Sequence, residues 1–203
     1  MDFVSDSLYN GHRFRCLTIV DNFSRYCHAI RVGKSIRGIE VVEVMEAIKK
    51  QDNAVPKRIQ VDNGSEFISK EFDRWAYENK VMLDYSRPGK PTDNPFIESF
   101  NGSFRDECLN VNWFLSLDDA YEKINSWVNE YNNFRPHSSL NEMTPAEFVD
   151  NFQVSEKKNK ALPGASVDEH LYFASVEHNP AATENTHVHQ QRYISSKSPE
   201  SIN

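Results

Sequence analysis

Long apolar runs, an excess of positive charge and paired cysteines are all missing from this sequence of 203 residues. No apolar stretch approaches the roughly 18 residues that a membrane-spanning helix needs. Asp2 stands where a secretory signal carries basic residues. The three cysteines, Cys16, Cys27 and Cys108, are odd in number and lack metal-ligand spacing, which indicates buried thiols in a reducing compartment. The sequence therefore predicts a soluble, cytosolic protein with no membrane partner.

The balance of charge excludes a simple polycationic DNA-binding protein. Lys and Arg number 23 against 30 Asp and Glu, a formal net charge of −7, whereas non-specific DNA affinity comes from basic residues that contact phosphates. An acidic enzyme can still act on DNA if its carboxylates surround metal ions and its basic residues line one face. Composition leaves this question open.

The first 86 residues combine an antiparallel part with later crossover helices. β-Branched and aromatic residues alternate with other residues on both sides of a turn at 21–24. Apolar residues with helical spacing follow at 36–50. The expected elements are strands at 1–4, 14–20, 26–32, 58–62 and 81–85, and helices at 36–50 and 69–80, the latter capped by Ser69. This order predicts an α/β protein with a five-stranded mixed sheet flanked by helices, in which the first and fourth strands are parallel neighbours. Such a layout is ribonuclease-H-like.

The second half is helical and ends in a polar tail. After a loop at 86–91, Asp93 or Asn94 can cap a helix that holds Pro95 in its first turn and runs to about residue 109. A helix at 116–133 carries an apolar stripe, and a short helix begins near Thr144. Beyond about residue 152 no apolar period persists. We expect one core at 1–150 and a loosely ordered tail at 151–203.

Three acids stand at positions that this fold would bring together: Asp2 on the first strand, Asp62 at the end of the fourth, and Glu98 in the first turn of the helix after the loop. Neighbouring strands lie about 5 Å apart. Clustered carboxylates repel one another unless divalent cations lie between them, an arrangement that supports in-line phosphoryl transfer. Alone, Asp62 could shape the turn at Asn63-Gly64, and Glu98 could complement a helix dipole.

The intervals and the flanking residues resemble those of a known family. In this sequence 59 residues separate Asp2 from Asp62 and 35 separate Asp62 from Glu98, and the second interval is typical of retroviral integrases and related bacterial transposases. Five segments resemble the motifs of insertion-sequence family three over roughly residues 1–150: 1–4, 20–25, 61–67, 93–102 and 131–137. The chain thus resembles a DDE transposase with a retroviral-integrase-like catalytic core. Since full-length relatives carry a DNA-recognition region upstream, the resemblance implies an N-terminally truncated chain.

The resemblance implies roles for individual residues. Asp2, Asp62 and Glu98 match the catalytic, metal-binding triad, and Arg105 matches the basic residue that the family places seven positions after the glutamate. Asn101 shares a helical face with Glu98 and Arg105, so it would also point toward metal and DNA. The alternative role for Arg105 is an ion pair with Asp106 or Glu107. Lys90 and Arg87, in the loop, are further candidate DNA contacts, whereas Asp21, in a hairpin turn, is expected to be structural.

The implied activity is DNA cleavage and strand transfer in the bacterial cytosol or nucleoid. The cofactor would be two Mg²⁺ ions, for which Mn²⁺ could substitute. The partners would be transposon ends, target DNA and further copies of the chain. Water would attack at the element end, and the exposed 3′-OH would attack a second phosphodiester without a covalent protein–DNA intermediate. Two alternatives remain: an inactive transposon remnant that only binds nucleic acid, and a ribonuclease-H-type nuclease.

Overall fold

A three-stranded antiparallel sheet forms the centre of the structure, a computed structural model that describes residues 1–86 and 95–160. Its strands are β1 (Asp2–Ser7), β2 (Arg13–Val20) and β3 (Cys27–Gly33), in the order β1-β2-β3. The register places Asp2 opposite Thr18. Gly11, with a φ of 83°, lies in the turn between β1 and β2, where a left-handed backbone favours glycine. The predicted meander is confirmed.

A second sheet pairs β4 (Arg58–Val61) with β5 (Met82–Tyr85) in parallel. Helix α1 (Gly38–Asp52) leads into β4, and α2 (Lys70–Glu78) crosses over between the two strands. The sequence predicted one five-stranded sheet, but the structure forms sheets of three and two strands. A hydrogen bond of 2.8 Å from the amino group of Met1 to the Gln60 carbonyl connects the two sheets. This bond joins β1 to β4 at one point, whereas a parallel ladder needs bonds at successive residues.

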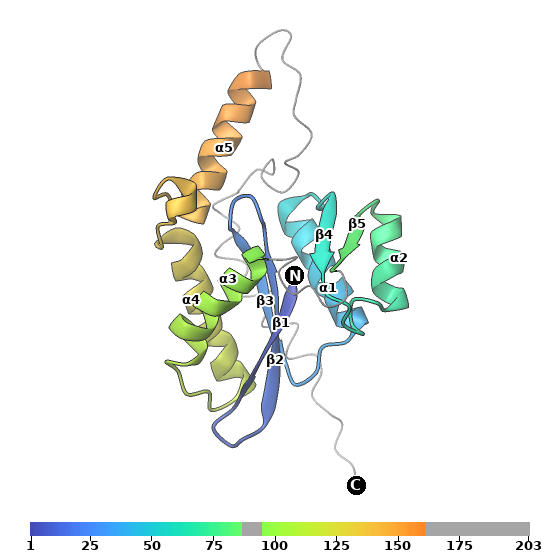
Figure 1. The fold of residues 1–203 in the computed structure, drawn as a ribbon, viewed down its shortest axis with the longest axis vertical. Coiled ribbons are helices and arrows are strands. Elements are labelled where there is room, and N and C mark those ends of the chain that lie inside the picture. Colours follow the sequence, from blue (N-terminus) through green and yellow to red (C-terminus); the bar gives the residue numbers. More distant parts are fainter. Residues whose placement is uncertain (87–94, 161–203) are drawn as a thin grey trace.

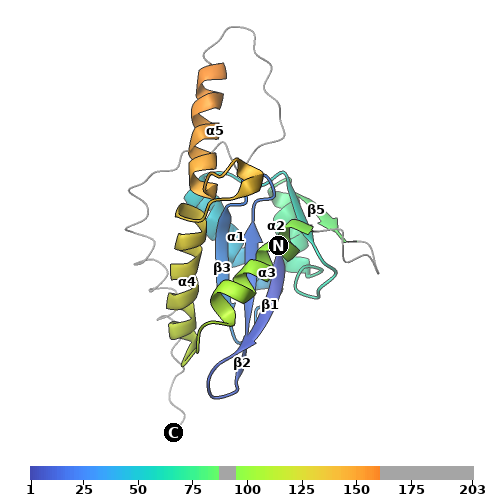
Figure 2. The same ribbon diagram turned by 60° about the vertical axis from the view of Figure 1, so that its left-hand side comes forward.

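The helices lie on the two faces of the three-stranded sheet (Figures 1 and 2). One side carries α3 (Pro95–Phe104), the π-helical turn η2 (Arg105–Leu109) and α4 (Leu117–Asn133); the other carries α1, α2 and the β4-β5 sheet. Strand β2 is buried on both faces: Phe14 and Cys16 face the first side, and Leu17 and Ile19 the second. Its alternation of side chains therefore builds two hydrophobic cores from one strand.

The helix after the loop does not keep α geometry to residue 109 as expected. It ends at Phe104, and the Asn110 amide then donates to the Arg105 carbonyl at 2.8 Å, a bond of π type. Because such a turn bonds residue i to i+5, it brings Phe104 and Leu109 to the same side. Both are buried in the core with Cys108, which explains the wider turn.

Local signals at the other helix starts are confirmed. The hydroxyls of Ser69 and Ser116 accept hydrogen bonds from the amides of Phe72 and Asp119, at 3.3 and 3.1 Å. Short turn η3 (Ser138–Leu140) precedes α5 (Pro145–Lys160), which runs beyond residue 150. Within the described residues no helix has the length and apolarity to cross a membrane.

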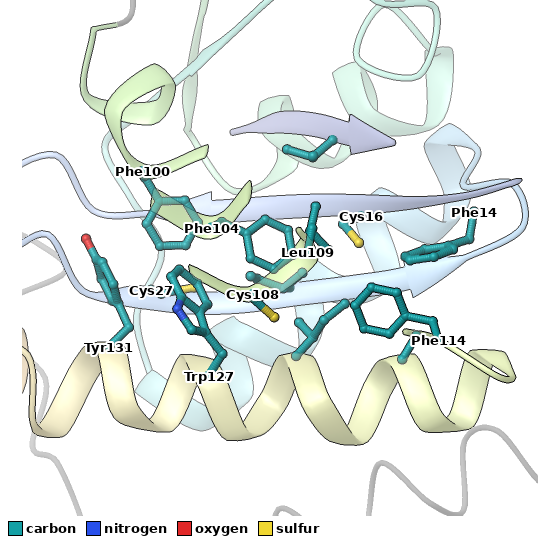
Figure 3. Close-up of a cluster of buried hydrophobic side chains, with 14 of the residues drawn as sticks. Phe14, Cys16, Cys27, Phe100, Phe104, Cys108, Leu109, Phe114, Trp127 and Tyr131 are labelled. Carbon is teal, nitrogen blue, oxygen red and sulfur yellow. The ribbon is translucent and has the colours of Figure 1, made fainter. Parts of the chain in front are cut away.

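The three cysteines are free and buried, as the sequence predicted. They lie in the core beneath α3 and α4 (Figure 3). Burial raises the pKa of all three thiols, that of Cys108 to about 12. A protonated thiol is a poor nucleophile and a poor metal ligand. These residues therefore act as small apolar side chains.

Candidate active site

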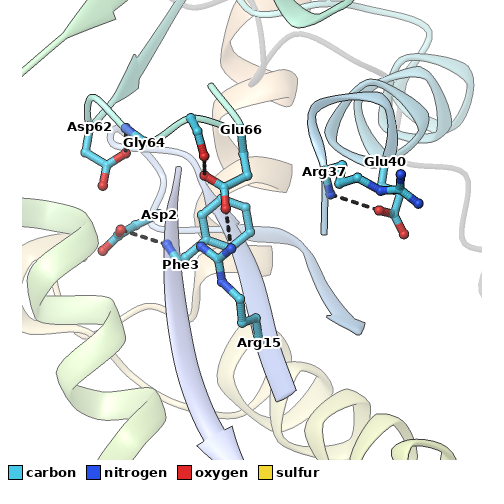
Figure 4. Close-up of polar contacts among 9 residues, drawn as sticks. Asp2, Phe3, Arg15, Arg37, Glu40, Asp62, Gly64 and Glu66 are labelled. Carbon is cyan, nitrogen blue, oxygen red and sulfur yellow. Dashed lines mark hydrogen bonds and ion pairs between the residues drawn. The ribbon is translucent and has the colours of Figure 1, made fainter. Parts of the chain in front are cut away.

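Asp2 and Asp62 lie side by side although 59 residues separate them in the sequence. Asp2 begins β1 and Asp62 directly follows β4, so the Met1–Gln60 bond brings the two together. Figure 4 shows the carboxyl groups close to each other at this edge. Burial raises the pKa of Asp2, and the charge of Asp62 adds to the rise. The pair therefore holds two negative charges close together in a partly buried place.

Two groups donate hydrogen bonds to the side chain of Asp2, and Thr18 lies beside one of them. Its Oδ1 accepts from the Phe3 amide at 2.7 Å, and its Oδ2 accepts from Nδ2 of Asn101 in α3, also at 2.7 Å. The hydroxyl of Thr18 lies 3.0 Å from Oδ1 of Asn101 and 3.2 Å from the Asp2 carbonyl oxygen. Asn101 thus contacts Asp2, one of the three acids of the expected triad. Thr18 sets which end of the Asn101 amide faces Asp2.

Thr18 is a member of the site that the sequence analysis did not find. Its side chain is fully buried within a strand of apolar residues, so it reads as an ordinary β-branched strand residue. The only sequence signal is a hydroxyl in the middle of an apolar run, and a buried hydroxyl requires a hydrogen-bond partner. That signal indicates a polar neighbour without identifying it.

The loop that carries Asp62 is fixed by its own turn and by an ion pair. The Gly64 amide donates to Oδ1 of Asp62 at 2.9 Å, so the carboxylate does shape the turn as the alternative reading held. Arg15 of β2 pairs with Glu66, and its guanidinium lies 4.1 Å from the centre of the Phe3 ring (Figure 4). This contact ties the loop to β1 and β2, beside Asp2.

Glu98 lies exposed in the first turn of α3. Within residues 1–86 and 95–160, no group of three His, Cys, Asp or Glu residues is close enough to hold one metal ion. The structure therefore brings together two of the three predicted acids with Asn101, and leaves Glu98 apart. Lys90 and Arg87 lie outside the described residues.

Arg105 lies at the start of η2, where its Nη2 donates to the Ser5 carbonyl of β1 at 3.3 Å. Its two neighbouring acids have other partners: Asp106 accepts from Asn110 at 3.4 Å, and Glu107 pairs with Arg135. The alternative of an ion pair within the helix is therefore not what the structure shows. The exposed guanidinium keeps N–H groups that face solvent.

Replacing Thr18 with valine is expected to raise the metal concentration needed for half-maximal DNA joining about 10- to 100-fold, the usual effect of losing an outer-shell partner. Valine has the shape of threonine but cannot donate to Asn101, so the amide loses its preferred orientation against Asp2. The measurement is the metal concentration that gives half-maximal activity. Thr18→Ser keeps the hydroxyl, so its half-maximal metal concentration should equal that of the wild type. Equal concentrations for the valine and serine variants would contradict a role of Thr18 in orienting Asn101.

Two family models match the chain, and both are described as the integrase core domain. One covers residues 1–91 and the other residues 79–145, so that together they span the part of the chain that contains Asp2, Asp62 and Glu98. The chain belongs to the integrase core family. The family resemblance inferred from the motifs is thereby confirmed.

Individual relatives of this integrase core come from bacterial insertion elements. The chain is 46% identical over 149 residues to the 31.7 kDa protein of insertion element IS407 from Burkholderia multivorans, covering 73% of this chain and 53% of the relative. It is 42% identical over 163 residues to the 39.2 kDa protein of IS476 from Xanthomonas euvesicatoria, covering 80% and 46%. The chain thus spans about half the length of these relatives.

The fold is that of retroviral integrase catalytic cores. The catalytic core domain of HTLV-2 integrase, solved in complex with magnesium, superposes with a TM-score of 0.52 at 18% identity, over 72% of this chain and 94% of that one. The ribonuclease-H-like α/β class expected from the order of elements is confirmed, while the single five-stranded sheet is not seen.

Proposed function

We propose that this chain is the catalytic domain of a DDE transposase of insertion-sequence family three, which cleaves DNA and joins DNA strands during transposition. The observation that carries the proposal is the meeting of Asp2 and Asp62 where β1 adjoins β4. Membership of the integrase core family and relatives from two insertion elements support it. On this proposal Glu98 completes the catalytic triad from α3, and β1 lies beside β4 in one mixed sheet.

The residues present fit a divalent cation. Asp2 and Asp62 offer carboxylate oxygens, the donors that Mg²⁺ prefers, and the raised pKa of Asp2 reflects burial and repulsion that a cation would relieve. Asp2, Asp62 and Glu98 would hold two Mg²⁺ ions, or Mn²⁺ in their place. When bound, the ions would activate the attacking oxygen and stabilise the charge on the phosphodiester.

The chain's own residues prepare this chemistry. Asn101 and the Phe3 amide orient the carboxylate of Asp2, and the Gly64 amide orients that of Asp62. Arg105 is placed to contact a DNA phosphate with its exposed N–H groups. Water first attacks the phosphodiester at the element end and releases a 3′-OH; that hydroxyl then attacks a second phosphodiester and displaces its 3′ oxygen. Lys90 and Arg87 would contribute further DNA contacts.

The proposal also assigns partners and boundaries. Residues 1–150 form the catalytic core, and residues 151–203 an appended tail. The core acts on transposon ends and target DNA as an oligomer assembled on DNA, in the cytosol of a bacterium. The carboxylates can act at any phosphodiester. Selection of one DNA end therefore requires protein side chains that read base edges in a DNA groove.

The test is strand joining on DNA that already carries a recessed 3′-OH at the border of the insertion element. We expect a joined product with Mg²⁺ or Mn²⁺ and none with a chelator. An absence of product with either metal would favour an inactive remnant. Cleavage of an RNA–DNA hybrid without any joining of DNA would favour the nuclease instead.

A further inference from the structure

Two segments that resemble family motifs have no role in the site described above: residues 20–25, after β2, and residues 131–137, at the end of α4. In the structure both contact α3, the helix that carries Glu98: Arg25 lies on Phe96 in its first turn, and the ring centroid of Tyr131 lies 5.0 Å from that of Phe100. Figures 1 and 2 show the β2-β3 turn beside the beginning of α3 and the base of α5. The two segments meet through Arg25, whose charge acts on Tyr131 and His137.

The turn after β2 holds Arg25 in a defined conformation. Asp21 accepts hydrogen bonds from the Ser24 amide at 2.8 Å through its carboxylate and from the Arg25 amide at 2.9 Å through its carbonyl. Arg25 adopts a φ of 62°, a left-handed conformation that is uncommon for a non-glycine residue and is often found at functional sites. Phe23 anchors the turn against Phe148 of α5, with ring centroids 5.2 Å apart.

The side chain of Arg25 lies over the ring of Phe96, 3.9 Å from its centre. One guanidinium nitrogen, Nη1, donates to the Asn22 carbonyl. Phe96 is 42% exposed and, like Glu98, lies in the first turn of α3, so the stacked pair is at the surface at the N-terminal end of this helix. Stacking fixes the plane of the guanidinium and leaves its other N–H groups free to donate at their edge.

Arg25 forms no ion pair within the described residues. The charge of Asp21 acts on it, but that carboxylate accepts its hydrogen bonds from the turn. Burial lowers the pKa of Arg25. Burial also lowers the pKa of His137; the charges of Arg135 and Arg25 lower it further, and the charge of Glu107, which pairs with Arg135, raises it. Arg25 is thus a partly buried cation without an ion pair among the described residues. Binding of an external anion would stabilise its charge.

We propose that Arg25 is a DNA-contact residue, which binds a backbone phosphate of the DNA while Phe96 holds its guanidinium in position. The proposal rests on the proposed function. A planar fork of N–H donors matches phosphate oxygens, and Arg–phosphate hydrogen bonds are among the stronger polar contacts. The turn at 20–25 would then present one arginine to DNA at the N-terminal end of α3, the helix that carries Glu98.

The experiment compares Arg25→Gln with Arg58→Gln, which removes the same charge from an exposed arginine of β4 that pairs with Asp84. Binding of a duplex with a recessed 3′-OH is measured in the presence of a chelator, so that no chemistry intervenes. We expect Arg25→Gln to bind about tenfold more weakly, with a salt slope lower by about one. Arg58→Gln should bind like the wild type.

A second measurement locates the phosphate. Methylphosphonates, which carry no charge, replace the phosphates around the joined position one at a time. One replacement should weaken binding of the wild type and leave Arg25→Gln unaffected, because the contact is already lost. Arg25→Lys keeps the charge without the fork and should retain part of the effect, and melting temperatures verify folding of each variant. Equal losses for Arg25→Gln and Arg58→Gln, or no phosphate coupled to Arg25, would overturn the contact.

These outcomes are separable from the proposed function. If the wild type joins DNA and Arg25→Gln binds normally, the DNA contact is wrong and the transposase function stands. If the wild type neither binds nor joins DNA with any metal, the function itself fails, and the contact fails with it.

Discussion

Replacing Asp62 with asparagine is expected to abolish strand joining and the stabilisation of the chain by divalent metal. The substitution keeps the shape of the side chain and an oxygen for the Gly64 amide, so the turn persists. It removes the charge that, on the proposed function, binds a cation beside Asp2. Since loss of an outer-shell partner already costs about 10- to 100-fold, loss of a direct ligand should cost more than about 100-fold in the rate of joining.

The measurement pairs the joining assay with a melting scan. A metal at about 100 times its dissociation constant stabilises a folded protein by about 2.7 kcal/mol, and this increment should vanish in Asp62→Asn. Asp118→Asn makes the same change at an exposed acid of α4 and serves as the matched control. Equal metal-dependent shifts in the two variants would show that the ion binds elsewhere.

Replacing Phe104 with alanine is expected to destabilise the fold by about 3–5 kcal/mol, the usual cost of emptying a buried aromatic site. Phe104 is fully buried at the last position of α3 (Figure 3). Its ring centroid lies 5.1 Å from that of Trp127 in α4 and 6.4 Å from that of Phe100. The alanine would leave a cavity between α3, α4 and the sheet. Because α3 carries Glu98 and Asn101, joining activity should fall as well.

Urea unfolding measures this loss as a lower midpoint at an unchanged slope. Tyr77→Ala is the matched control, because Tyr77 on α2 is 85% exposed and a surface change is usually within about 0.5 kcal/mol of neutral. Phe104→Leu should lie between the two. A Phe104→Ala variant as stable as Tyr77→Ala would show that α3 does not depend on this core.

Elements with strong local signals were predictable from the sequence. The meander follows from alternating side chains and turn residues between the strands, and helices α2 and α4 begin at the serines that cap them. Each of these signals depends on residues a few positions apart. The structural role of Asp21 was also predicted correctly, since the hydrogen bonds of its carboxylate remain within three residues.

Features set by distant contacts were not predictable. The predicted single five-stranded sheet is seen as sheets of three and two strands, and the order of elements does not say how far β1 and β4 run side by side. The change to a π-turn at Arg105 depends on burial of both Phe104 and Leu109, which a helical period cannot show. In both cases, packing between distant elements determines the backbone geometry, and the local sequence pattern does not.

The sequence by itself determined which acids to consider, since the residue types and intervals of Asp2, Asp62 and Glu98 point to one family and one chemistry. Only the tertiary structure decided which groups meet. It joined Asp2 to Asp62 and Asn101, ordered Asn101 through Thr18, and placed Arg25 on Phe96. The physical reason is distance along the chain: these residues lie 60 to 99 positions apart, so they meet only once the two sheets and α3 have packed together.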